Sequence, residues 1–319
     1  MTRLFEWGCE MRPCISIVRV AKNDLHNLRQ SIPIILKQKI AIPYELIVID
    51  SGSRDGSVEF VKQTSKIDGR LSLYEIPSEK FHHARTRNLG ISLSKSRIVV
   101  LLNGDAIPCD EHWLHNITRP VINGESAGIA ASYGKQIPRG DVDISNYCRM
   151  TFNYHNNYRV KDKNTNLSKA ELYFFSSVNC CINTEMISEP VFNEKFPVYE
   201  DVTLSYRIIS NDMRIAYCPD APVIHSHNFS YYDIMRRYFD AGSVWKRIGI
   251  FLKNDKSISS DRKRFINHSI NIIKKRTIID KLKFSGFLIF AGLGFKLGLN
   301  YHYLPKSICR KYLSQYGTV

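Results

Sequence analysis

Four short runs of β-branched and aliphatic residues constrain the fold more than any other feature of the sequence. Each has the length and composition of a buried strand, and they lie at Ile15–Val20, Tyr44–Asp50, Leu71–Ile76 and Arg97–Asn103. The segments between them have room for helices, as at Ser57–Ser65 and Ala84–Ser94. Strands that alternate with helices favour a doubly wound, Rossmann-like α/β fold with a mostly parallel sheet.

Three further features set the expected organisation. Pro33 falls inside the first predicted helix, where it should kink the helix or make it restart. Residues 127–183 are richer in Tyr, Asn and charge, and we expect mixed strands and loops there. The pattern becomes helical and basic from Tyr231 onward. We therefore expect an α/β domain over residues 1–248 and a mainly helical extension over residues 249–319.

The positive charge of the chain is concentrated at its end. The net charge is +15, yet residues 231–319 carry 18 Lys and Arg against 5 Asp and Glu, whereas residues 1–230 carry 27 against 25. A basic block of this kind serves either nucleic acid or an anionic membrane surface. Composition alone does not decide between the two.

The cysteines indicate whether the chain has a structural zinc site, and the N-terminus indicates its cellular compartment. The eight cysteines form no C-x-x-C pair, and no histidine stands at zinc-finger spacing from them. This argues against a structural zinc site. Glu6 and Glu10 fall where a secretory signal would need an apolar run. We therefore expect a cytoplasmic protein with reduced thiols.

Polar residues follow three of the predicted strands, at the edge where ligands bind in such sheets. They occupy positions 18–23, 50–53 and 103–105, and we expect them to converge. The carboxylate of Asp50 can accept hydrogen bonds from a uracil or thymine N–H or from ribose hydroxyls. The alternative to donor binding is that this segment is only a strand–turn–helix connection, in which Asp55 caps the next helix. Asp105 can hold a divalent cation against a diphosphate, although a single Asp after a strand is usually a turn residue.

An acidic pair and a histidine pair follow in the second half of the chain. Glu200 and Asp201 adjoin at the start of a predicted helix. They serve either as charges that favour the helix dipole or as a general base for an acceptor hydroxyl. His225 and His227 are two residues apart, so on an extended segment they point the same way. That arrangement suits one metal ligand and one partner that supports it.

These motifs, in this order, resemble those of the family 2 glycosyltransferases, and most closely the bacterial rhamnosyltransferase-like branch. The resemblance spans about residues 14–245. Its most specific parts are FHHARTRNLG (81–90), LLNGDAIPCDEHWL (101–114), the acidic pair at 200–201 and HSHNFSYYDIMRRYFDAG (225–242). It implies a GT-A fold and an inverting transfer from a nucleotide-sugar donor.

The resemblance also implies roles for individual residues. Asp201 would be the general base, and Glu200 would orient the acceptor. Asp105 would hold a divalent cation, Mg²⁺ or Mn²⁺, with His225 as a second metal contact. The donor would be bound by Arg19, Asp50, Ser53, Arg87, Asn103, Gly104 and Arg237.

One departure from the family pattern concerns the metal. The DxD motif of the family reads Asn103-Gly104-Asp105 here, so its first acid is missing. Related rhamnosyltransferase-like sequences also tend to keep only the last Asp. We expect weaker metal binding or a greater dependence on the phosphates of the donor. The resemblance favours dTDP-rhamnose as donor, with UDP-hexoses and UDP-N-acetylhexosamines as alternatives, and a lipid-linked or O-antigen polysaccharide as acceptor.

The basic tail predicts peripheral contact with the anionic inner face of the cell membrane. Basic clusters at 246–247, 262–264 and 274–276 precede the apolar run Phe284–Phe295, and Lys306, Arg310 and Lys311 follow it. The run is too short to span a bilayer, so we expect an amphipathic segment that lies in the interface. The alternative is a helical appendage that packs its Phe and Leu residues onto the catalytic domain.

Two other classes of function compete. A nucleic-acid-binding protein would fit the basic composition, but the sequence has no helix-turn-helix or RRM-type motif, and we expect no nucleic-acid partner. A nucleotide-sugar-binding pseudoenzyme would fit the incomplete DxD motif. The presence of Asp105, Asp201 and His225 favours an enzyme.

Overall fold

The computed structural model describes residues 15–196, 198–249, 256–305, 307 and 309. Glu6 and Glu10, on which the expectation about a signal segment depends, lie outside these residues, as do the tail cations Lys306, Arg310 and Lys311.

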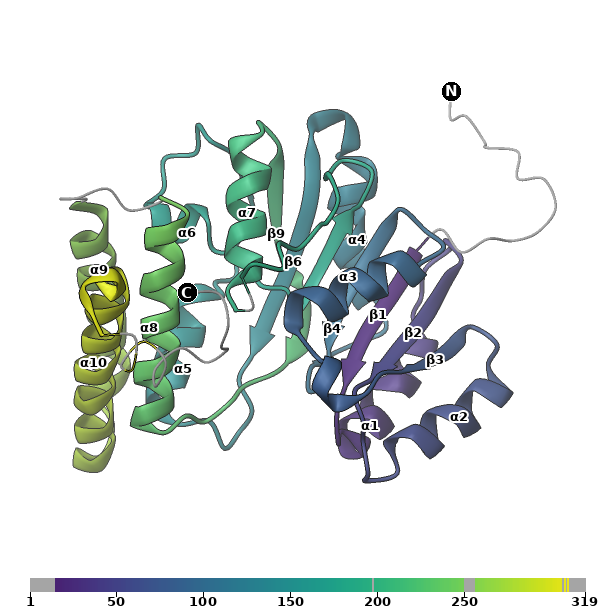
Figure 1. Ribbon diagram of the computed structural model, residues 1–319, viewed down its shortest axis with the longest axis horizontal. Coiled ribbons are helices and arrows are strands. Elements are labelled where there is room, and N and C mark those ends of the chain that lie inside the picture. The colour runs from purple at the N-terminus through teal and green to yellow at the C-terminus, as the bar shows by residue number, and fades with distance from the viewer. Residues whose placement is uncertain (1–14, 197, 250–255, 306, 308, 310–319) are drawn as a thin grey trace.

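One mixed sheet forms the centre of the molecule (Figure 1). Its strands are β1 (Ile15–Ala21), β2 (Tyr44–Asp50), β3 (Leu71–Glu75), β4 (Ile98–Asn103), β5 (Ile107–Pro108), β6 (Ile129–Ile137), β7 (Arg159–Lys161), β8 (Asn179–Asn183) and β9 (Arg214–Ile224). They run in the order β3-β2-β1-β4-β8-β6-β9-β5, and β7 pairs with β9. The first four strands are parallel, as predicted. β8 is antiparallel to both β4 and β6, so the parallel arrangement holds for the N-terminal half and the sheet becomes mixed beyond it.

Helices cover both faces of this sheet, and each face has its own apolar core. α1 (Leu25–Leu36), α2 (Ser57–Ile67) and α4 (Trp113–Asn123) pack on one face. α3 (His83–Leu93) and α7 (Glu200–Ser210) pack on the other. The predicted doubly wound arrangement is therefore confirmed, and the carboxyl ends of the parallel strands are left open between the two layers of helices.

The first helix does not restart at Pro33, and the alternative, a kink there, stays a prediction. α1 runs from Leu25 to Leu36 through Pro33 without a restart. Proline removes one backbone hydrogen bond, but Leu28, Ile32 and Ile35 are fully buried against the sheet. Packing of this apolar face against the sheet holds the last turn of the helix in place. The local effect of proline, on which the prediction was based, takes no account of such packing.

The C-terminal extension is helical, as expected, and contains α9 (Lys256–Ile273) and α10 (Ile278–Leu299). α8 (Tyr231–Arg247) precedes it, and the middle region, where mixed strands and loops were expected, also holds α5 (Ile144–Asn153) and α6 (Lys169–Leu172). Among the described residues, short 3₁₀ turns occur at Ser78–Lys80, Glu125–Ala127 and Tyr301–Tyr303. Figure 1 shows α10 lying along α8 at the edge of the molecule. A third apolar core joins α5, α8, α9 and α10 around Phe284 and Phe287.

α10 is longer than the apolar run that it contains. It has 22 residues, and by length and composition alone it is long and apolar enough to cross a membrane. The expectation of a segment too short to span a bilayer concerned the run Phe284–Phe295 alone. The whole helix is longer, because it continues past Lys283 and Lys296 on either side of that run. One side of α10 is used for packing, since Phe284, Phe287 and Ala291 are buried in the third core.

Candidate functional site

The loops that follow β1, β2 and β4 converge, as the sequence predicted. The backbone N–H of Asn23 donates to Ser53 Oγ at 2.7 Å, and Asn23 Oδ1 accepts from the backbone N–H of Arg54 at 2.8 Å. The guanidinium of Arg19 donates to the carbonyl oxygens of Gly104 and Ala106. Three segments that are distant in sequence thus form one edge of the site.

Asp50 orders the turn that follows β2. Its side chain accepts from the backbone N–H groups of Gly52 and Ser53 at 2.9 and 2.8 Å, and from Ser53 Oγ. Gly52 has a φ of +83°, a left-handed conformation that favours glycine. The capping contact expected of Asp55 is also present, because Asp55 accepts from the backbone N–H groups of Leu25 at 2.9 Å and of the first α2 residue at 3.1 Å.

Arg19 supports the loop that carries Asp105. Its side chain is fully buried, pairs with Asp24 at 3.5 Å and donates to Ala106 O at 3.0 Å. Burial lowers the pKa of Arg19 to about 10. Gly104 is closely packed under this loop, since a Cβ there would lie 2.6 Å from the carbonyl oxygen of Val20. Arg19 and Gly104 therefore set the position of the Asp105 backbone.

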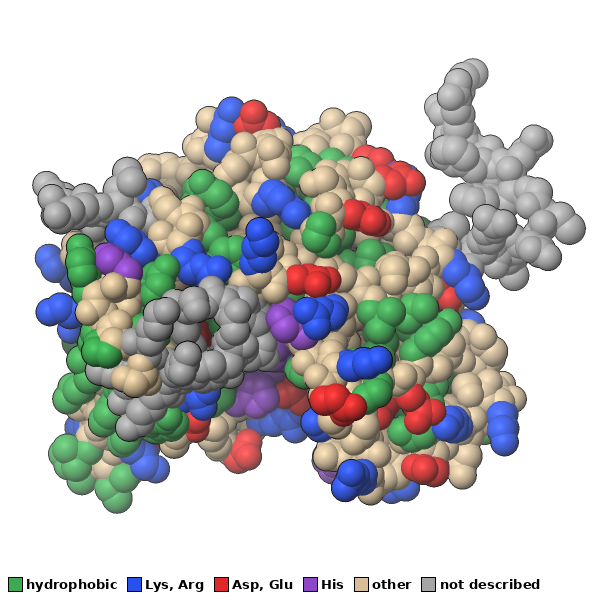
Figure 2. Space-filling view, viewed as in Figure 1, with side chains coloured by type: hydrophobic (Ala, Val, Ile, Leu, Met, Phe, Trp, Pro, Cys, Tyr) green, Lys and Arg blue, Asp and Glu red, His purple; other side chains and the backbone are tan. Residues whose placement is uncertain are grey.

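Asp105, His225 and His227 form a cluster that could hold a metal ion, with one ligand atom from each residue within 4.8 Å of the others. Nε2 of His225 and Nε2 of His227 lie 3.4 and 3.1 Å from Asp105 Oδ2. Burial alone raises the pKa of Asp105, but the two histidine rings that face its carboxylate lower the pKa below its usual range. Figure 2 shows histidine side chains in the recessed centre of this face, beside acidic and basic ones.

The donor set of this cluster fits a divalent cation. His225 is buried, and among the described residues its Nε2 atom has no hydrogen-bond partner. Its Nδ1 atom lies 2.9 Å from Gln136 Oε1. A histidine bonded through one ring nitrogen and free at the other is the usual state of a metal ligand. One carboxylate and two imidazoles are ligands that Mn²⁺ accepts.

The structure brings Asp105 and His225 together and places His227 in the same cluster. His227 was expected to support the ligand, but its Nε2 faces the same carboxylate oxygen as His225 does. The supporting position behind His225 belongs to Gln136, which sequence reasoning missed because the two residues are 89 positions apart. Only the pairing of β6 with β9 brings them together.

Glu200 and Asp201 begin α7 after a turn in which Tyr199 has a φ of +57°. The Arg87 guanidinium donates to Glu200 Oε1 at 2.5 Å and to Asn103 Oδ1 at 3.0 Å. Both partners of the Arg87–Glu200 ion pair are buried. Arg87 therefore joins the loop after β4 to the acidic pair, and its charge is largely matched by Glu200.

Asp201 lies in a different environment from Glu200, although the two are adjacent. It is half-buried, and its Oδ1 accepts from the backbone N–H of Val202 at 2.8 Å. Burial, together with repulsion from the Glu200 charge, raises the pKa of Asp201 well above the ordinary value for aspartate. A carboxylate with a raised pKa is a stronger proton acceptor, which is the property a general base needs.

Arg237 adjoins the histidine cluster through an aromatic ring. Its guanidinium lies 4.4 Å from the ring centroid of Phe229, and that ring lies 5.6 Å from the ring of His227. The backbone carbonyl of Arg237 accepts from Tyr199 Oη at 2.9 Å, which ties α8 to the acidic turn. Nearby, burial and the charge of Arg87 lower the pKa of His83 to about 4, so His83 is neutral at pH 7.

Residues 16–189 match the family described as glycosyl transferase family 2. The chain belongs to this family. Over 288 residues it is 31% identical to the O-antigen chain rhamnosyltransferase RfbN of Salmonella typhimurium, and the match covers 88% of each chain. It is also 30% identical over 280 residues to the O-antigen chain rhamnosyltransferase WbaN of Salmonella anatum, which covers 86% of this chain and 85% of WbaN. This family 2 chain is therefore a glycosyltransferase with rhamnosyltransferase relatives.

Solved structures with the same fold agree with this assignment. A mannosyltransferase from Pyrobaculum calidifontis, in complex with GDP-Man and Mn²⁺, has a TM-score of 0.56 at 15% identity and covers 94% of this chain and 79% of its own. Residues 1–349 of TarS from S. aureus have a TM-score of 0.51 at 12% identity, and cover 93% of this chain and 88% of that structure. The glycosyltransferase therefore has a GT-A fold, with a C-terminal helical extension.

Proposed function

We propose that this glycosyltransferase transfers rhamnose from dTDP-rhamnose with inversion of the anomeric carbon, and that Asp201 is its general base. The arrangement of the acidic turn carries this proposal. Arg87 pairs with Glu200 at 2.5 Å, while burial and the Glu200 charge raise the pKa of Asp201. The similarity to two O-antigen chain rhamnosyltransferases over most of the chain supports the choice of sugar.

The chemistry is a single displacement. Asp201 takes the proton of an acceptor hydroxyl while that oxygen forms a bond to the anomeric carbon. The bond between the anomeric carbon and the diphosphate oxygen breaks on the opposite face, and dTDP leaves with the electron pair. Asp50 and Ser53 are the proposed contacts for the base and ribose of the donor. Arg237 is the proposed cation near the leaving phosphates.

The proposed metal ligands are Asp105, His225 and His227, with Mn²⁺ or Mg²⁺ as the ion. A divalent cation bound there would supply positive charge against the diphosphate of the donor. The buried Nε2 of His225, which has no hydrogen-bond partner within the described part of the chain, supports this assignment. The loop that presents Asp105 is held by Arg19, and Arg139 donates to the Asp105 backbone carbonyl at 2.6 Å.

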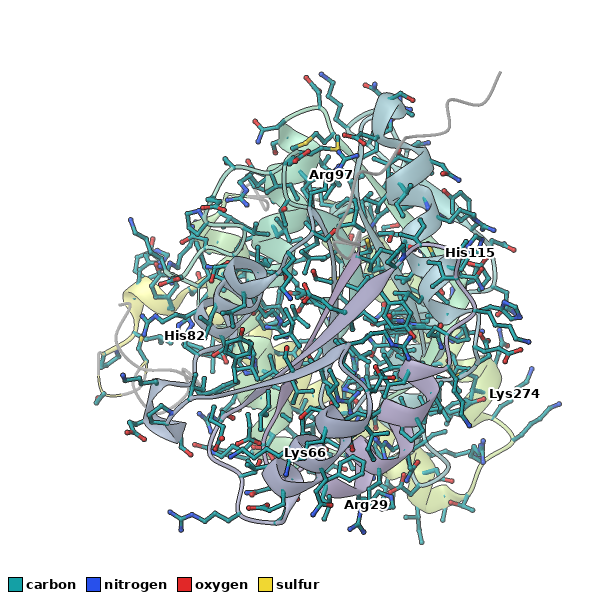
Figure 3. All side chains as sticks on the ribbon, turned by 90° about the vertical axis from the view of Figure 1, so that its right-hand side faces the viewer. Arg29, Lys66, His82, Arg97, His115 and Lys274 are labelled. Carbon is teal, nitrogen blue, oxygen red and sulfur yellow. The ribbon has the colours of Figure 1, made fainter. Side chains whose placement is uncertain are left out.

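The proposed acceptor is a lipid-linked saccharide at the cytoplasmic face of the membrane. The exposed side of α9 and α10 supports membrane contact, since the large apolar side chains exposed there include Ile270, Ile278, Ile279, Leu282, Ile289 and Leu293. Figure 2 shows hydrophobic side chains with Lys and Arg among them along this edge. Lys274, at the turn between α9 and α10, points outward into solvent (Figure 3).

Release of nucleoside diphosphate from a panel of donors tests this function. We expect turnover with Mn²⁺ present, fastest with dTDP-rhamnose and slower with UDP-glucose and UDP-N-acetylglucosamine. Faster turnover of a UDP-sugar would replace the proposed donor. Binding of donors without any hydrolysis or transfer would favour a pseudoenzyme.

Asp201→Asn separates the general base from the binding site. We expect kcat to fall by about 10²- to 10⁴-fold, the usual contribution of a general base. Donor affinity should stay within a few-fold of wild type, as measured by calorimetry. The thermal midpoint should be unchanged or higher, because a neutral amide replaces a carboxyl whose charged form is disfavoured by burial. Near-normal kcat in this variant would rule out Asp201 as the base.

A further inference from the structure

Gln136 lies directly behind the histidine cluster. It is the penultimate residue of β6, is 5% exposed, and sits on a strand that runs parallel to β9. The backbone N–H of His225 donates to Ile137 O at 3.0 Å, so the two strands hold His225 beside Gln136. The pairing of β6 with β9 therefore fixes the position of His225 relative to the Gln136 side chain.

The contact between the two side chains determines which ring nitrogen of His225 is protonated. Gln136 Oε1 lies 2.9 Å from Nδ1 of His225, and a carbonyl oxygen only accepts, so Nδ1 carries the proton. The lone pair of His225 is then on Nε2. That atom is buried, lacks a hydrogen-bond partner among the described residues, and lies 3.4 Å from Asp105 Oδ2.

The other end of the Gln136 amide reaches the loop before β8. Its Nε2 donates to Ser176 Oγ at 2.8 Å, and both residues are buried. The next residue, Ser177, donates from Oγ to Glu200 Oε1 at 3.3 Å. His225 is therefore connected to Glu200 through Gln136 and the loop residues Ser176 and Ser177.

We propose that Gln136 is a positioning residue that orients His225 as a metal ligand and anchors it to the loop that contacts Glu200. This rests on the proposed metal site. The amide suits both tasks, since its oxygen accepts from Nδ1 of His225 while its nitrogen donates to Ser176. Supporting residues of this kind typically change metal affinity by 10- to 100-fold when they are removed.

Titration of the full chain with MnCl₂ alone, followed by calorimetry, tests the first task. We expect Gln136→Leu to raise the Kd for Mn²⁺ by about 10- to 100-fold. Gln136→Glu keeps an acceptor toward His225 and should bind Mn²⁺ at least as tightly as wild type. Gln38→Leu is the matched control, since Gln38 is also buried and bonded at both ends, to Asp110 O at 2.8 Å and to the Leu114 N–H at 2.7 Å. Its Kd should not change.

Ser176→Ala tests the second task, because it removes the anchor and leaves the contact between Gln136 and His225. We expect the Kd for Mn²⁺ to rise, but by less than in Gln136→Leu. An unchanged Kd would show that the loop does not support the histidine, and would overturn this half of the proposal.

The outcomes distinguish this inference from the proposed metal site. If wild type and His225→Ala bind Mn²⁺ equally, the metal site itself is wrong. If His225→Ala loses binding while Gln136→Leu binds like wild type, the site stands and the role of Gln136 is wrong. If Gln136→Leu fails to fold by thermal denaturation, Gln136→Glu decides, and weaker Mn²⁺ binding in that variant would overturn the proposal.

Discussion

The surroundings of Asp201 act in opposite directions on protein stability and on the proposed role of this residue as a general base. Its carboxyl group is half-buried beside Glu200, and both burial and the neighbouring charge disfavour its ionised form. The same two effects strengthen it as a proton acceptor. Glu200, in contrast, forms a buried ion pair with Arg87. Two adjacent acids are thereby given different properties by what surrounds them.

Glu200→Gln should shift the pH dependence of the reaction. A general base must be deprotonated, so with Asp201 as the proposed base we expect kcat/KM to rise with pH through the pKa of Asp201. Because the Glu200 charge raises that pKa and Arg87 lowers it, removing the charge and leaving Arg87 unmatched both lower the pKa. We expect the acid limb of the pH–rate profile to move to lower pH, whatever the loss in maximal rate.

The matched control for this experiment is Glu194→Gln. Glu194 is a half-buried acid that pairs with Arg85 at 3.3 Å, and the charges that act most on the pKa of Asp201 are those of Glu200 and Arg87. Its profile should coincide with that of wild type. An acid limb that stays in place or moves to higher pH in Glu200→Gln would mean that Asp201 is not the titrating base.

Sequence reasoning identified most of the individual acids but not their partners. Asp50, Asp105 and Asp201 follow strands or start a helix, which made them candidates, and the family resemblance gave them their expected roles. The contacts of Arg87 with Glu200 and of Gln136 with His225 join residues 113 and 89 positions apart. Such pairs depend on strand order and helix packing, which local patterns do not specify.

At the scale of elements, α10 is joined to the catalytic half through α8. Glycines of α10 allow the two backbones to approach closely: a Cβ at Gly294 would lie 2.3 Å from Met235 O, and one at Gly298 would lie 2.1 Å from Phe239 O. α8 in turn accepts a hydrogen bond from Tyr199 at the carbonyl of Arg237. Displacement of α8 would therefore disturb the turn that carries the acidic pair.

Gly294→Ala should lower the free energy of unfolding by about 1–3 kcal/mol, the usual cost of overpacking, because the added methyl group meets backbone atoms that cannot rotate away. Gly292→Ala is the matched control on the same helix. A Cβ at Gly292 has nothing within 4 Å, so this change should stabilise the helix by up to about 1 kcal/mol. Denaturant unfolding measures both, and equal stabilities would argue against close α8–α10 packing.

The elements themselves were predictable to different degrees. The first four strands are rich in aliphatic and β-branched residues, and their bounds agree with the structure within a residue or two. The direction of β8 was not predictable, because its five residues are buried whichever way the strand runs. The full length of α10 was missed because Lys281, Lys283 and Lys296 interrupt the apolar run while the helix continues.

At the scale of the whole molecule, charge and apolar surface lie on the same flank. The net charge of +13 in residues 231–319 falls on the part of the chain that holds α9 and α10. The opposite side of α10 is buried against α8 and α9. A helix with one side packed on protein and the other exposing Leu282 and Ile289 suits a membrane surface better than a membrane span.

Flotation with lipid vesicles tests this arrangement. We expect wild type to bind vesicles that contain anionic lipid, to bind neutral vesicles weakly, and to be released at high salt. Replacing Lys274, Lys275 and Arg276 with serine should weaken binding by about 100-fold, at about 1 kcal/mol for each cation. The double variant Leu282→Asn and Ile289→Asn should also reduce binding, whereas Ile67→Asn, on the exposed face of α2, should not. A wild-type protein that resists extraction by both high salt and alkaline buffer would instead indicate that α10 leaves α8 and crosses the bilayer.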